Sequence, residues 1–280
     1  MKKLMSCAGA VGVAALVLSG CEGSGGDTEV AADCTPAAEF ETITDGTLTV
    51  SVPELPPFTQ YEDGEPVGAD IDYVAAFAEA NCKSVNWMQT QYAGAIPAVT
   101  EDRADMATGA FYRTEERDAV VGLGDPVYVD TMASISADGV TSIADMEEMN
   151  VGSVDGYLWV TDMNEVLGDS FTIYPSAVEM QADLDAGRID VGLDSFGSAG
   201  ERLKDDDEYT VETVESDDRV AASVEPAQIT FPHTQDNDAM TEALNEWVAT
   251  AHEDGTIAEV LESHGLPAES ADTGEPRLIG

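Results

Sequence analysis

The stretch Thr47-Leu48-Thr49-Val50-Ser51-Val52 alternates polar and apolar residues, and it begins the part of the chain that decides the fold. This period of two predicts a strand. The next segment, 53–68, is rich in Pro and Gly and is predicted to be a loop. Apolar spacing then predicts a helix near 71–78, a strand at 85–88, a helix near 96–99 and a strand at 105–108. This alternation predicts an α/β fold, with a parallel sheet flanked by helices.

The same alternation restarts in the second half of the chain. A short helix is predicted at 142–149, strands at 151–154, 171–174 and 189–193, and helices at 158–167 and 176–186. Strand-like segments at 127–129 and 219–231 lie before and after this second unit. Two extended crossings between two lobes would make a hinge.

These patterns define the domain organisation that we expect. The first lobe comprises 45–131 and 229–266, and the second comprises 132–228. Helical spacing from Met240 to Ala251 and from Ile257 to Leu261 returns the C-terminal part to the first lobe. The polar C-terminal tail, 267–280, is expected to be loose.

The N-terminus predicts export. Lys2 and Lys3 precede an apolar stretch at 8–18 that is too short to span a bilayer. The following Leu18-Ser19-Gly20-Cys21 resembles a bacterial lipobox, which implies a signal peptide at 1–20, a lipid on Cys21 and a tether at 21–44. The alternative is an ordinary signal peptide with an incidental cysteine. No later stretch is apolar enough to cross a membrane, so we expect a protein anchored by its lipid to the extracytoplasmic face of the cell membrane.

The cysteines fit this location. Cys7 would leave with the signal peptide and Cys21 would carry the lipid, so Cys34 and Cys82 would remain. An even pair in an oxidising compartment favours a disulfide over two buried free thiols. The chain has no Cys-x-x-Cys, which argues against a zinc site or thioredoxin-like chemistry.

Composition excludes several functions. With 11 Lys and Arg against 56 Asp and Glu, the formal net charge is −45, and such a surface repels nucleic acid. The sequence lacks Gly-x-Ser-x-Gly, His-Glu-x-x-His and a Gly-rich phosphate loop, and it has only three histidines. The acidic run at 205–208 lacks the glycine and spacing of a calcium-binding loop. We therefore expect no catalytic residue, cofactor or metal.

Several segments between residues 46 and 265 resemble, in order, the family 3 extracellular solute-binding proteins of polar amino-acid ABC importers. They are 46–50 with Pro56-Pro57-Phe58, Gly68-Ala69-Asp70-Ile71-Asp72, 92–97, 103–105 with Thr114-Glu115-Glu116-Arg117, 125–128, Gly187-Arg188-Ile189-Asp190 and Asp254-Gly255-Thr256. The resemblance implies a two-lobed type II periplasmic-binding-protein fold, with the ligand in the cleft and closure by hinge bending.

The resemblance also implies particular ligand contacts. Arg117 would grip the ligand carboxylate through its planar pair of donors, helped by backbone N–H groups at 109–112. The alternative is a surface arginine paired with Glu115 or Asp118. Tyr92 would pack on the ligand side chain, or alternatively in the core. The full set of expected ligand-binding residues is Arg117, Tyr92, Ala110, Tyr112, Glu54, Phe58, Tyr157, Asp194 and Ser195.

The chain departs from the family pattern within this set. Tyr112 and Tyr157 stand where small hydroxyl residues are expected. The aspartate that binds the ligand ammonium should come five residues after Asp190, but Asp194 comes four after it and Ser195 five after it. A shift of one residue reverses the face of a strand residue. The pocket is thus expected to be wider, more aromatic and more acidic, suited to a modified amino acid, a betaine-like zwitterion or a cationic compound.

The sequence therefore predicts a monomeric lipoprotein that captures an amino-acid-like small molecule and delivers it to the permease of an ABC importer. One alternative is a ligand-sensing module for a separate signalling partner. Another is an exported dehydratase-like enzyme, since some relatives with this fold are dehydratases.

Overall fold

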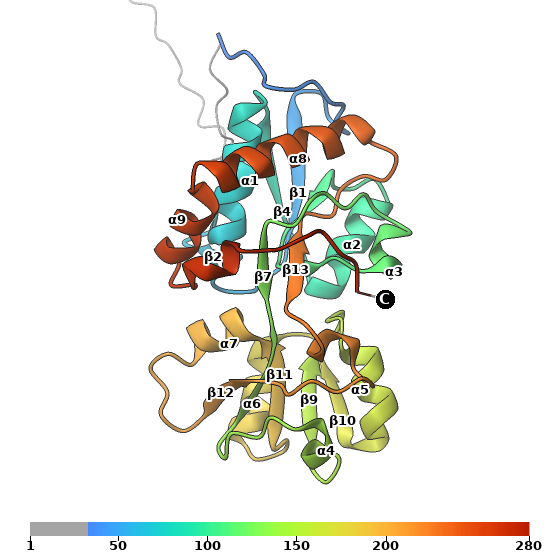
Figure 1. The fold of residues 1–280 in the computed structure, drawn as a ribbon, viewed down its shortest axis with the longest axis vertical. Helices are drawn as coiled ribbons and strands as arrows, with labels where there is room; N and C mark the ends of the chain where they lie inside the picture. The colour runs from blue at the N-terminus through green and yellow to red at the C-terminus, as the bar shows by residue number, and fades with distance from the viewer. Residues whose placement is uncertain (1–32, 280) are drawn as a thin grey trace, which may run out of the picture.

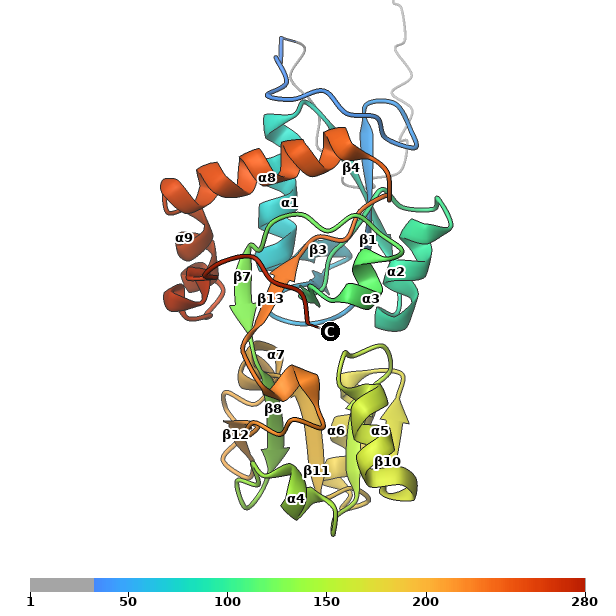
Figure 2. The same cartoon turned by 45° about the vertical axis from the view of Figure 1, so that its right-hand side comes forward.

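The computed structural model describes residues 33–279, and the predicted signal peptide and lipidated Cys21 lie outside them. The described chain forms two lobes, one above the other in Figures 1 and 2, with β7 (Tyr128–Asp130) and β13 (Ala227–Thr230) on the connections between them. The predicted two-lobed α/β fold is confirmed. Among the helices of residues 33–279, none has the length and hydropathy needed to cross a membrane.

The upper lobe is built on a parallel sheet in the order β4 (Ser84–Gln89), β1 (Thr47–Val52), β5 (Met106–Ala107). Val50 in the central strand pairs with Trp87 on one side and Met106 on the other. Both Val50 and its polar neighbour Ser51 are fully buried. The strand was predicted from alternation, but helices cover both of its faces, as in most parallel sheets.

A second sheet of the upper lobe carries the connections to the lower lobe. It is antiparallel, in the order β6 (Phe111–Tyr112), β13, β7. β7 leads directly into β8 (Met132–Ser136) of the lower lobe, and the chain returns through β13. The predicted strand at 219–231 was too long, because 221–223 forms a 3-10 turn and only 227–230 is extended.

The lower lobe contains a mixed five-stranded sheet in the order β10 (Phe171–Tyr174), β9 (Val151–Val154), β11 (Val191–Ser195), β8, β12 (Thr210–Thr213). β10, β9 and β11 are parallel, as predicted from the βα alternation. β8 and β12 are antiparallel additions that the alternation did not indicate. The exact residues that divide the lobes, 131–132 and 228–229, stay a prediction.

Helices flank the sheets of both lobes (Figure 1). In the upper lobe they are α1 (Ala69–Ala80), α2 (Tyr92–Thr100), α3 (Glu115–Asp118), α8 (Asp238–Glu253) and α9 (Thr256–Ser263). In the lower lobe they are α4 (Ile143–Met146), α5 (Val160–Leu167), α6 (Ala177–Asp185) and α7 (Phe196–Arg202). Short 3-10 turns occupy η1 (Gly168–Ser170), η2 (Ala221–Ser223) and η3 (Ala268–Ala271). The segment predicted as a loop at 53–68 contains a small hairpin of β2 (Gln60–Glu62) and β3 (Glu65–Val67).

The predicted disulfide is confirmed. Cys34 is bonded to Cys82, which ties the segment before β1 to the end of α1. The bridge closes a loop with a sequence separation of 48 residues. By the chain-entropy model, closing a loop of this length stabilises the folded state by about 4 kcal/mol.

The C-terminal tail differs from the expected loose segment. Ile279 donates its N–H to the Arg113 carbonyl and accepts from the Glu115 N–H, so the end of the described chain pairs beside α3. The buried side chain of Gln228 in β13 donates to the carbonyls of Thr273 and Glu275, at 2.8 Å each. The C-terminal tail is therefore held against the upper lobe by these bonds, and we call residues 273–279 the strap.

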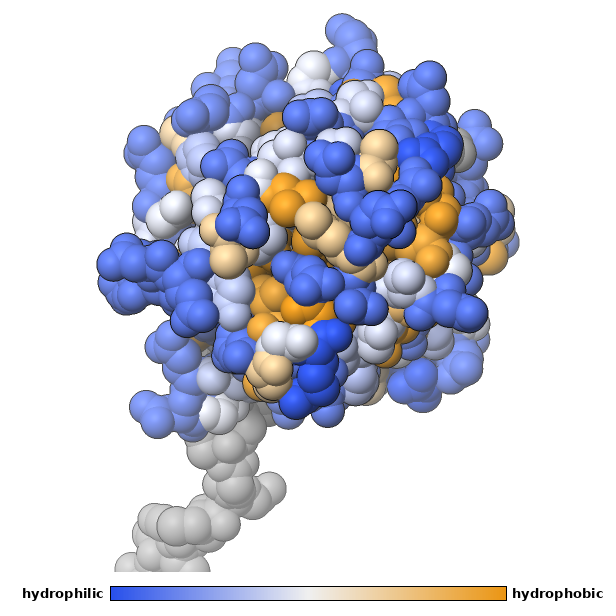
Figure 3. Space-filling model, turned by 90° about the horizontal axis from the view of Figure 1, so that it is seen from below, coloured by the Kyte–Doolittle hydropathy of each residue, from blue (hydrophilic) through white to orange (hydrophobic). Residues whose placement is uncertain are grey.

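The surface agrees with the acidic composition. The face of the molecule seen in Figure 3 is mainly hydrophilic, with small separate hydrophobic patches. Scattered patches of this kind are normal on a soluble surface.

Candidate functional site

The candidate site is a pocket between the two lobes, lined by residues from both. The lining residues are Leu55, Tyr92, Ala110, Tyr112, Arg117, Tyr157, Leu158, Trp159 and Ser195. The space between them is ≈ 250 Å³ when the part open to solvent is included, but only ≈ 10 Å³ is available to the centre of a water molecule. The lobes are therefore nearly closed on each other's side chains, and a ligand would need them to part.

Four aromatic rings line the pocket. The Tyr92 ring meets the Tyr157 ring edge-on, with 4.8 Å between centroids, and Tyr157 meets Trp159 in the same way at 5.1 Å. Trp159 then lies 6.0 Å from Tyr112, and Tyr92 stacks on Phe111 at 4.7 Å. Tyr92 and Tyr112 belong to the upper lobe, whereas Tyr157 and Trp159 belong to the lower. We call Tyr92, Tyr112, Tyr157 and Trp159 the ring wall.

The polar tips of the lower-lobe rings are held by groups that do not line the pocket. The Tyr157 hydroxyl donates to Asp194 Oδ1 at 3.0 Å, and Trp159 Nε1–H donates to Ser153 Oγ at 2.8 Å. Burial raises the pKa of Tyr157 well above its usual value, helped by the charge of Asp194. Tyr157 is therefore a neutral hydrogen-bond donor at neutral pH.

Arg117 bridges the lobes beside these rings. Its Nη1 donates to the Tyr112 carbonyl at 2.8 Å and its Nη2 to the Gly156 carbonyl of the lower lobe at 3.4 Å. Its guanidinium also lies over the Phe111 ring, 5.0 Å from the centroid. The hydroxyl of Thr114 caps the first turn of α3 by accepting from the Arg117 N–H. Within residues 33–279, Arg117 makes no ion pair, so neither carboxylate considered from the sequence holds it.

The turn before β6 is held by a buried carboxylate. Asp70, fully buried at the start of α1, accepts from the N–H groups of Gly109 and Ala110 at 2.8 and 3.0 Å and from the Tyr128 hydroxyl at 2.7 Å. Burial raises the pKa of Asp70, and these hydrogen bonds oppose the rise. Two of the backbone N–H groups expected to face a ligand are thus already bonded. A Cβ at Gly109, whose φ is +118°, would lie 2.6 Å from Pro53, so only glycine fits there.

Asp194 and Ser195 lie on opposite faces of the end of β11. Ser195 lines the pocket, whereas Asp194 is fully buried behind it. Asp194 Oδ2 accepts from Arg202 Nη2 at 2.6 Å, and Oδ1 accepts from the Ser195 N–H at 2.8 Å as well as from Tyr157. The one-residue difference from the family pattern therefore puts a hydroxyl at the pocket wall and an ion-paired carboxylate behind it.

Asp130 lies at the hinge, where β7 passes into the lower lobe. Its Oδ2 accepts from the Tyr112 hydroxyl at 3.3 Å, and its Oδ1 accepts from the Gly197 N–H at 3.3 Å. Burial raises the pKa of Asp130 to about 6, although hydrogen bonds from Ser195, Gly197 and Tyr112 oppose the rise. Asp130 therefore connects the ring wall to α7 of the lower lobe, and sequence reasoning did not find it.

Besides Asp194, two further expected site residues do not line this pocket. Phe58 is buried in the upper lobe, where it stacks on Tyr128 with 5.4 Å between centroids, and the side chain of Glu54 is exposed. The reason is a tight turn, in which the N–H of Leu55 donates to the Thr59 carbonyl. This turn aims Leu55 into the pocket and Phe58 into the core. Leu158 and Trp159 also line the pocket, but the sequence analysis did not predict them. Neither residue belongs to a motif, and the one signal in the sequence was that they directly follow Tyr157.

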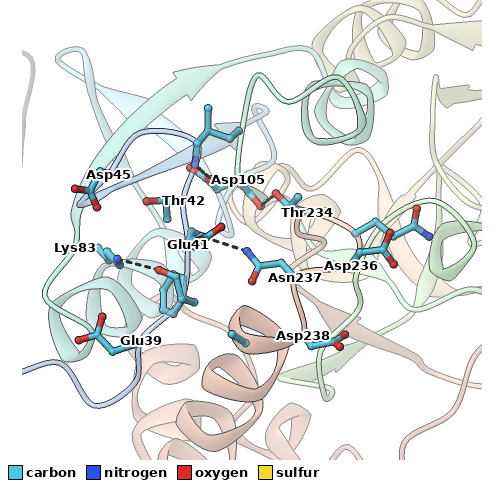
Figure 4. Close-up of a pocket in the computed structure, with 14 residues that line it drawn as sticks. Glu39, Glu41, Thr42, Asp45, Lys83, Asp105, Thr234, Asp236, Asn237 and Asp238 are labelled. Atoms are coloured by element: carbon cyan, nitrogen blue, oxygen red, sulfur yellow. Dashed lines mark hydrogen bonds between the residues drawn. The ribbon is translucent and has the colours of Figure 1, made fainter.

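A larger groove lies elsewhere, within the upper lobe (Figure 4). It has a volume of ≈ 980 Å³, and its polar groups largely bind one another. Lys83 donates to the Phe40 carbonyl, Asn237 to the Glu41 carbonyl, and Asp105 accepts from the Ile43 N–H. It is open and has no part in the hinge. Across residues 33–279, no cluster of three or more His, Cys, Asp or Glu side chains could hold a metal ion.

Two lobes joined by extended crossings, with a pocket between them, define a type II periplasmic binding protein. Residues 48–266 match the model of the bacterial extracellular solute-binding proteins, family 3, and the chain belongs to this family. It is a solute-binding protein, as the sequence predicted.

The similarity to individual proteins of known name is low or covers only part of the chain. A probable histidine-binding protein of Campylobacter jejuni is 33% identical over 86 residues, which is 30% of this chain and 34% of that protein. The match thus spans about a third of that relative's length.

Three solved structures share the fold. A substrate-binding protein of Streptococcus pneumoniae with bound histidine has a TM-score of 0.73 at 19% identity, over 83% of this chain and 96% of that chain. EhuB in complex with hydroxyectoine has a TM-score of 0.72 at 21% identity, over 82% and 92%. An ancestral arginine-binding protein bound to arginine has a TM-score of 0.68 at 22% identity, over 78% and 98%.

Proposed function

We propose that this protein captures a small amino-acid-like zwitterion in the interlobe pocket and delivers it to the permease of an ABC importer. The observation that carries this proposal is the position of Arg117. Its guanidinium lies at the junction of the lobes, without a carboxylate partner in residues 33–279, and beside a wall of aromatic rings. A cation held this way is ready for an anionic group of a ligand.

The geometry suits capture by closure. Arg117 uses two of its five N–H donors on backbone carbonyls, one in each lobe. A ligand carboxylate that accepts the remaining donors would add a charge-assisted bond that the closed form alone completes. The ligand would then shift the population from open to closed, which a permease can distinguish.

The named relatives support the class of ligand. Histidine and arginine are bound in two of the related structures, and both are zwitterions with a carboxylate. Among the described residues that line the pocket, Arg117 is the one charged side chain. That composition favours a ligand with one carboxylate over a dicarboxylate.

The proposal is tested by identifying the solute. Protein purified from its native membrane is denatured, and the released small molecules are analysed by mass spectrometry. A thermal-shift screen of amino acids, betaines and polyamines runs in parallel. A zwitterion in stoichiometric amount, which also raises the melting temperature, is expected. A protein that releases no solute and responds to none of these compounds would contradict the proposal.

We also propose that Cys21 carries a lipid that holds the protein at the extracytoplasmic face of the membrane. Support comes from the lipobox-like Leu18-Ser19-Gly20-Cys21 and from the extracellular family. Cys21→Ser removes the thioether position, so this variant should leave the membrane fraction or stay unprocessed. Detergent partitioning measures this, and processed Cys21→Ser protein that stays in the membrane fraction would count against the anchor.

A further inference from the structure

The ring wall presents mainly aromatic carbon rather than hydrogen-bonding groups to the pocket. Three of its four rings direct their polar atoms to Asp130, Asp194 and Ser153, none of which lines the pocket. The fourth ring, Tyr92, has its hydroxyl beside the Arg117 guanidinium. Burial raises the pKa of Tyr92 to about 12, and the charge of Arg117 and its hydrogen bond partly oppose this rise. The faces that remain carry the negative side of the ring quadrupoles.

The two carboxylates directly behind the ring wall, Asp194 and Asp130, are already occupied. Both oxygens of Asp194 are bonded, one to Arg202 at 2.6 Å and the other to Tyr157 and to the Ser195 N–H. Both oxygens of Asp130 are also bonded, from Tyr112 and Gly197. A primary ammonium has three N–H donors, and its charge would find no carboxylate among the residues that line this pocket. Leaving such donors unsatisfied on burial is costly.

A cation without N–H donors avoids this cost. A trimethylammonium group spreads its charge over methyl groups, which need no acceptor and pack against ring faces by cation–π attraction. The buried carboxyl group of Asp130, which has no ion-pair partner in residues 33–279, adds negative potential behind the rings when it is ionised. Burial of the ring wall strengthens both effects, because the exposed fraction of every ring is 9% or less.

From this arrangement we infer that the ligand is an N-methylated zwitterion: a carboxylate held by Arg117 and a fully alkylated ammonium held by the ring wall. This inference rests on the proposed function and narrows it. The pocket would select N-methyl groups because its lining has no carboxylate to pair with a primary ammonium, as well as because its rings attract a methylated cation.

The test compares each amino acid with its own N-methylated form. Isothermal titration of the full-length protein uses three pairs: glycine and glycine betaine, proline and proline betaine, histidine and its N-trimethyl form. At least one methylated compound should bind ten times more tightly than its parent, a difference of about 1.4 kcal/mol. If the parent amino acid binds as tightly or more tightly in every pair that binds, the inference is wrong while the proposed function stands. If no compound binds and no solute is released on denaturation, the proposed function itself fails, and the inference with it.

A pair of variants tests the ring faces separately. Trp159→Phe and Trp159→Leu both remove the bond to Ser153, but only Trp159→Phe keeps an aromatic face. We expect Trp159→Leu to bind the methylated compound at least ten times more weakly than Trp159→Phe. Equal affinities of the two variants, with both folded by circular dichroism, would overturn the role of the ring face. Thermal denaturation in the absence of ligand verifies that both variants fold.

Discussion

Arg202 and Asp194 form an ion pair of 2.6 Å behind the pocket, with the carboxylate fully buried and the arginine side chain 19% exposed. Both residues belong to the lower lobe, one at the end of β11 and the other at the end of α7. The pair therefore forms whether or not a ligand is bound. It takes from the pocket the carboxylate that would otherwise stand ready for a ligand ammonium.

Removing Arg202 should release that carboxylate. In Arg202→Met the oxygen of Asp194 that Arg202 held becomes free, so an unmethylated amino acid should gain at least tenfold in affinity relative to its methylated form. The protein should also lose about 3 kcal/mol of stability, because one buried charge loses its partner. Isothermal titration and urea unfolding measure the two effects.

The control for this variant is Arg188→Met in the same lobe. Arg188 pairs with Asp183 at the surface, with 59% of its side chain exposed. A solvent-exposed pair contributes little to stability, so stability should change little and ligand preference not at all. If Arg202→Met kept the wild-type preference, Asp194 would have no part in ligand selection.

Arg117→Ala should weaken binding of the identified ligand by about two orders of magnitude. Truncating one partner of a desolvated charge pair costs several kcal/mol, and each 1.4 kcal/mol is tenfold. Arg117→Lys should also bind poorly, since a point charge cannot replace a planar pair of donors. The matched control is Arg103→Ala, because Arg103 is exposed and pairs locally with Glu101. Titration that finds Arg117→Ala within threefold of the wild type would refute the carboxylate contact.

The sequence predicted the parallel strands and their helices because burial repeats there with a clear period. β9 and β10 begin and end where they were predicted. β8 was missed: all five of its residues are buried, including Ser134 and Ser136, so it shows no alternation. The hydrogen bonds of these serines to Val140 are local and leave no pattern in the sequence.

The site was predictable only where a motif marked it. Arg117 and Tyr92 follow from the resemblance, and both line the pocket. Trp159 carries no motif, and its role depends on a ring contact with Tyr112 from the other lobe. Asp130 likewise acquires its importance from partners far along the chain, such as Gly197. Contacts made only when the two lobes meet have no signal in a single sequence.

Asp130 should make stability depend on pH in a defined range. Its pKa is raised from the ordinary value of 3.8 to about 6 in the folded protein. The folded state therefore binds more protons than the unfolded state between these values, and Asp130 lowers stability as the pH rises from about 4 to about 6. The Asn side chain of Asp130→Asn cannot ionise. As the pH rises through this range, the free energy of unfolding of the variant should therefore increase relative to that of the wild type, by at most about 3 kcal/mol.

Urea unfolding of both proteins without ligand, at pH 4 and pH 7 and at one ionic strength, measures this gain. The many other carboxylates titrate in both proteins and cancel in the difference. A difference that is the same at the two pH values would mean that Asp130 has an ordinary pKa in the folded state.

The last prediction concerns the strap formed by the C-terminal tail. The side chain of Gln228 is 2% exposed and makes every hydrogen bond open to it. Its amide nitrogen donates to Thr273 and Glu275, and its oxygen accepts from the Arg277 N–H and from Arg113. Because these bonds join the hinge strand β13 to the tail, Gln228→Ala should release the tail and lower the free energy of unfolding by about 2 kcal/mol. For a chain of this size, that is a fall in melting temperature of roughly 4–8 °C.

Deleting 273–280 should have the same effect on stability, and it should also weaken ligand binding several-fold. The weaker binding is expected because Ile279 forms backbone hydrogen bonds with Arg113 and Glu115, the two neighbours of Thr114. Thr114 caps the helix that carries Arg117. Gln235→Ala is the control, since Gln235 is exposed and makes one bond, to the Ala119 carbonyl. It should change stability by less than about 0.5 kcal/mol. Calorimetry and titration separate the two roles: a truncated protein that melts and binds like the wild type would show that the strap supports neither the hinge nor α3.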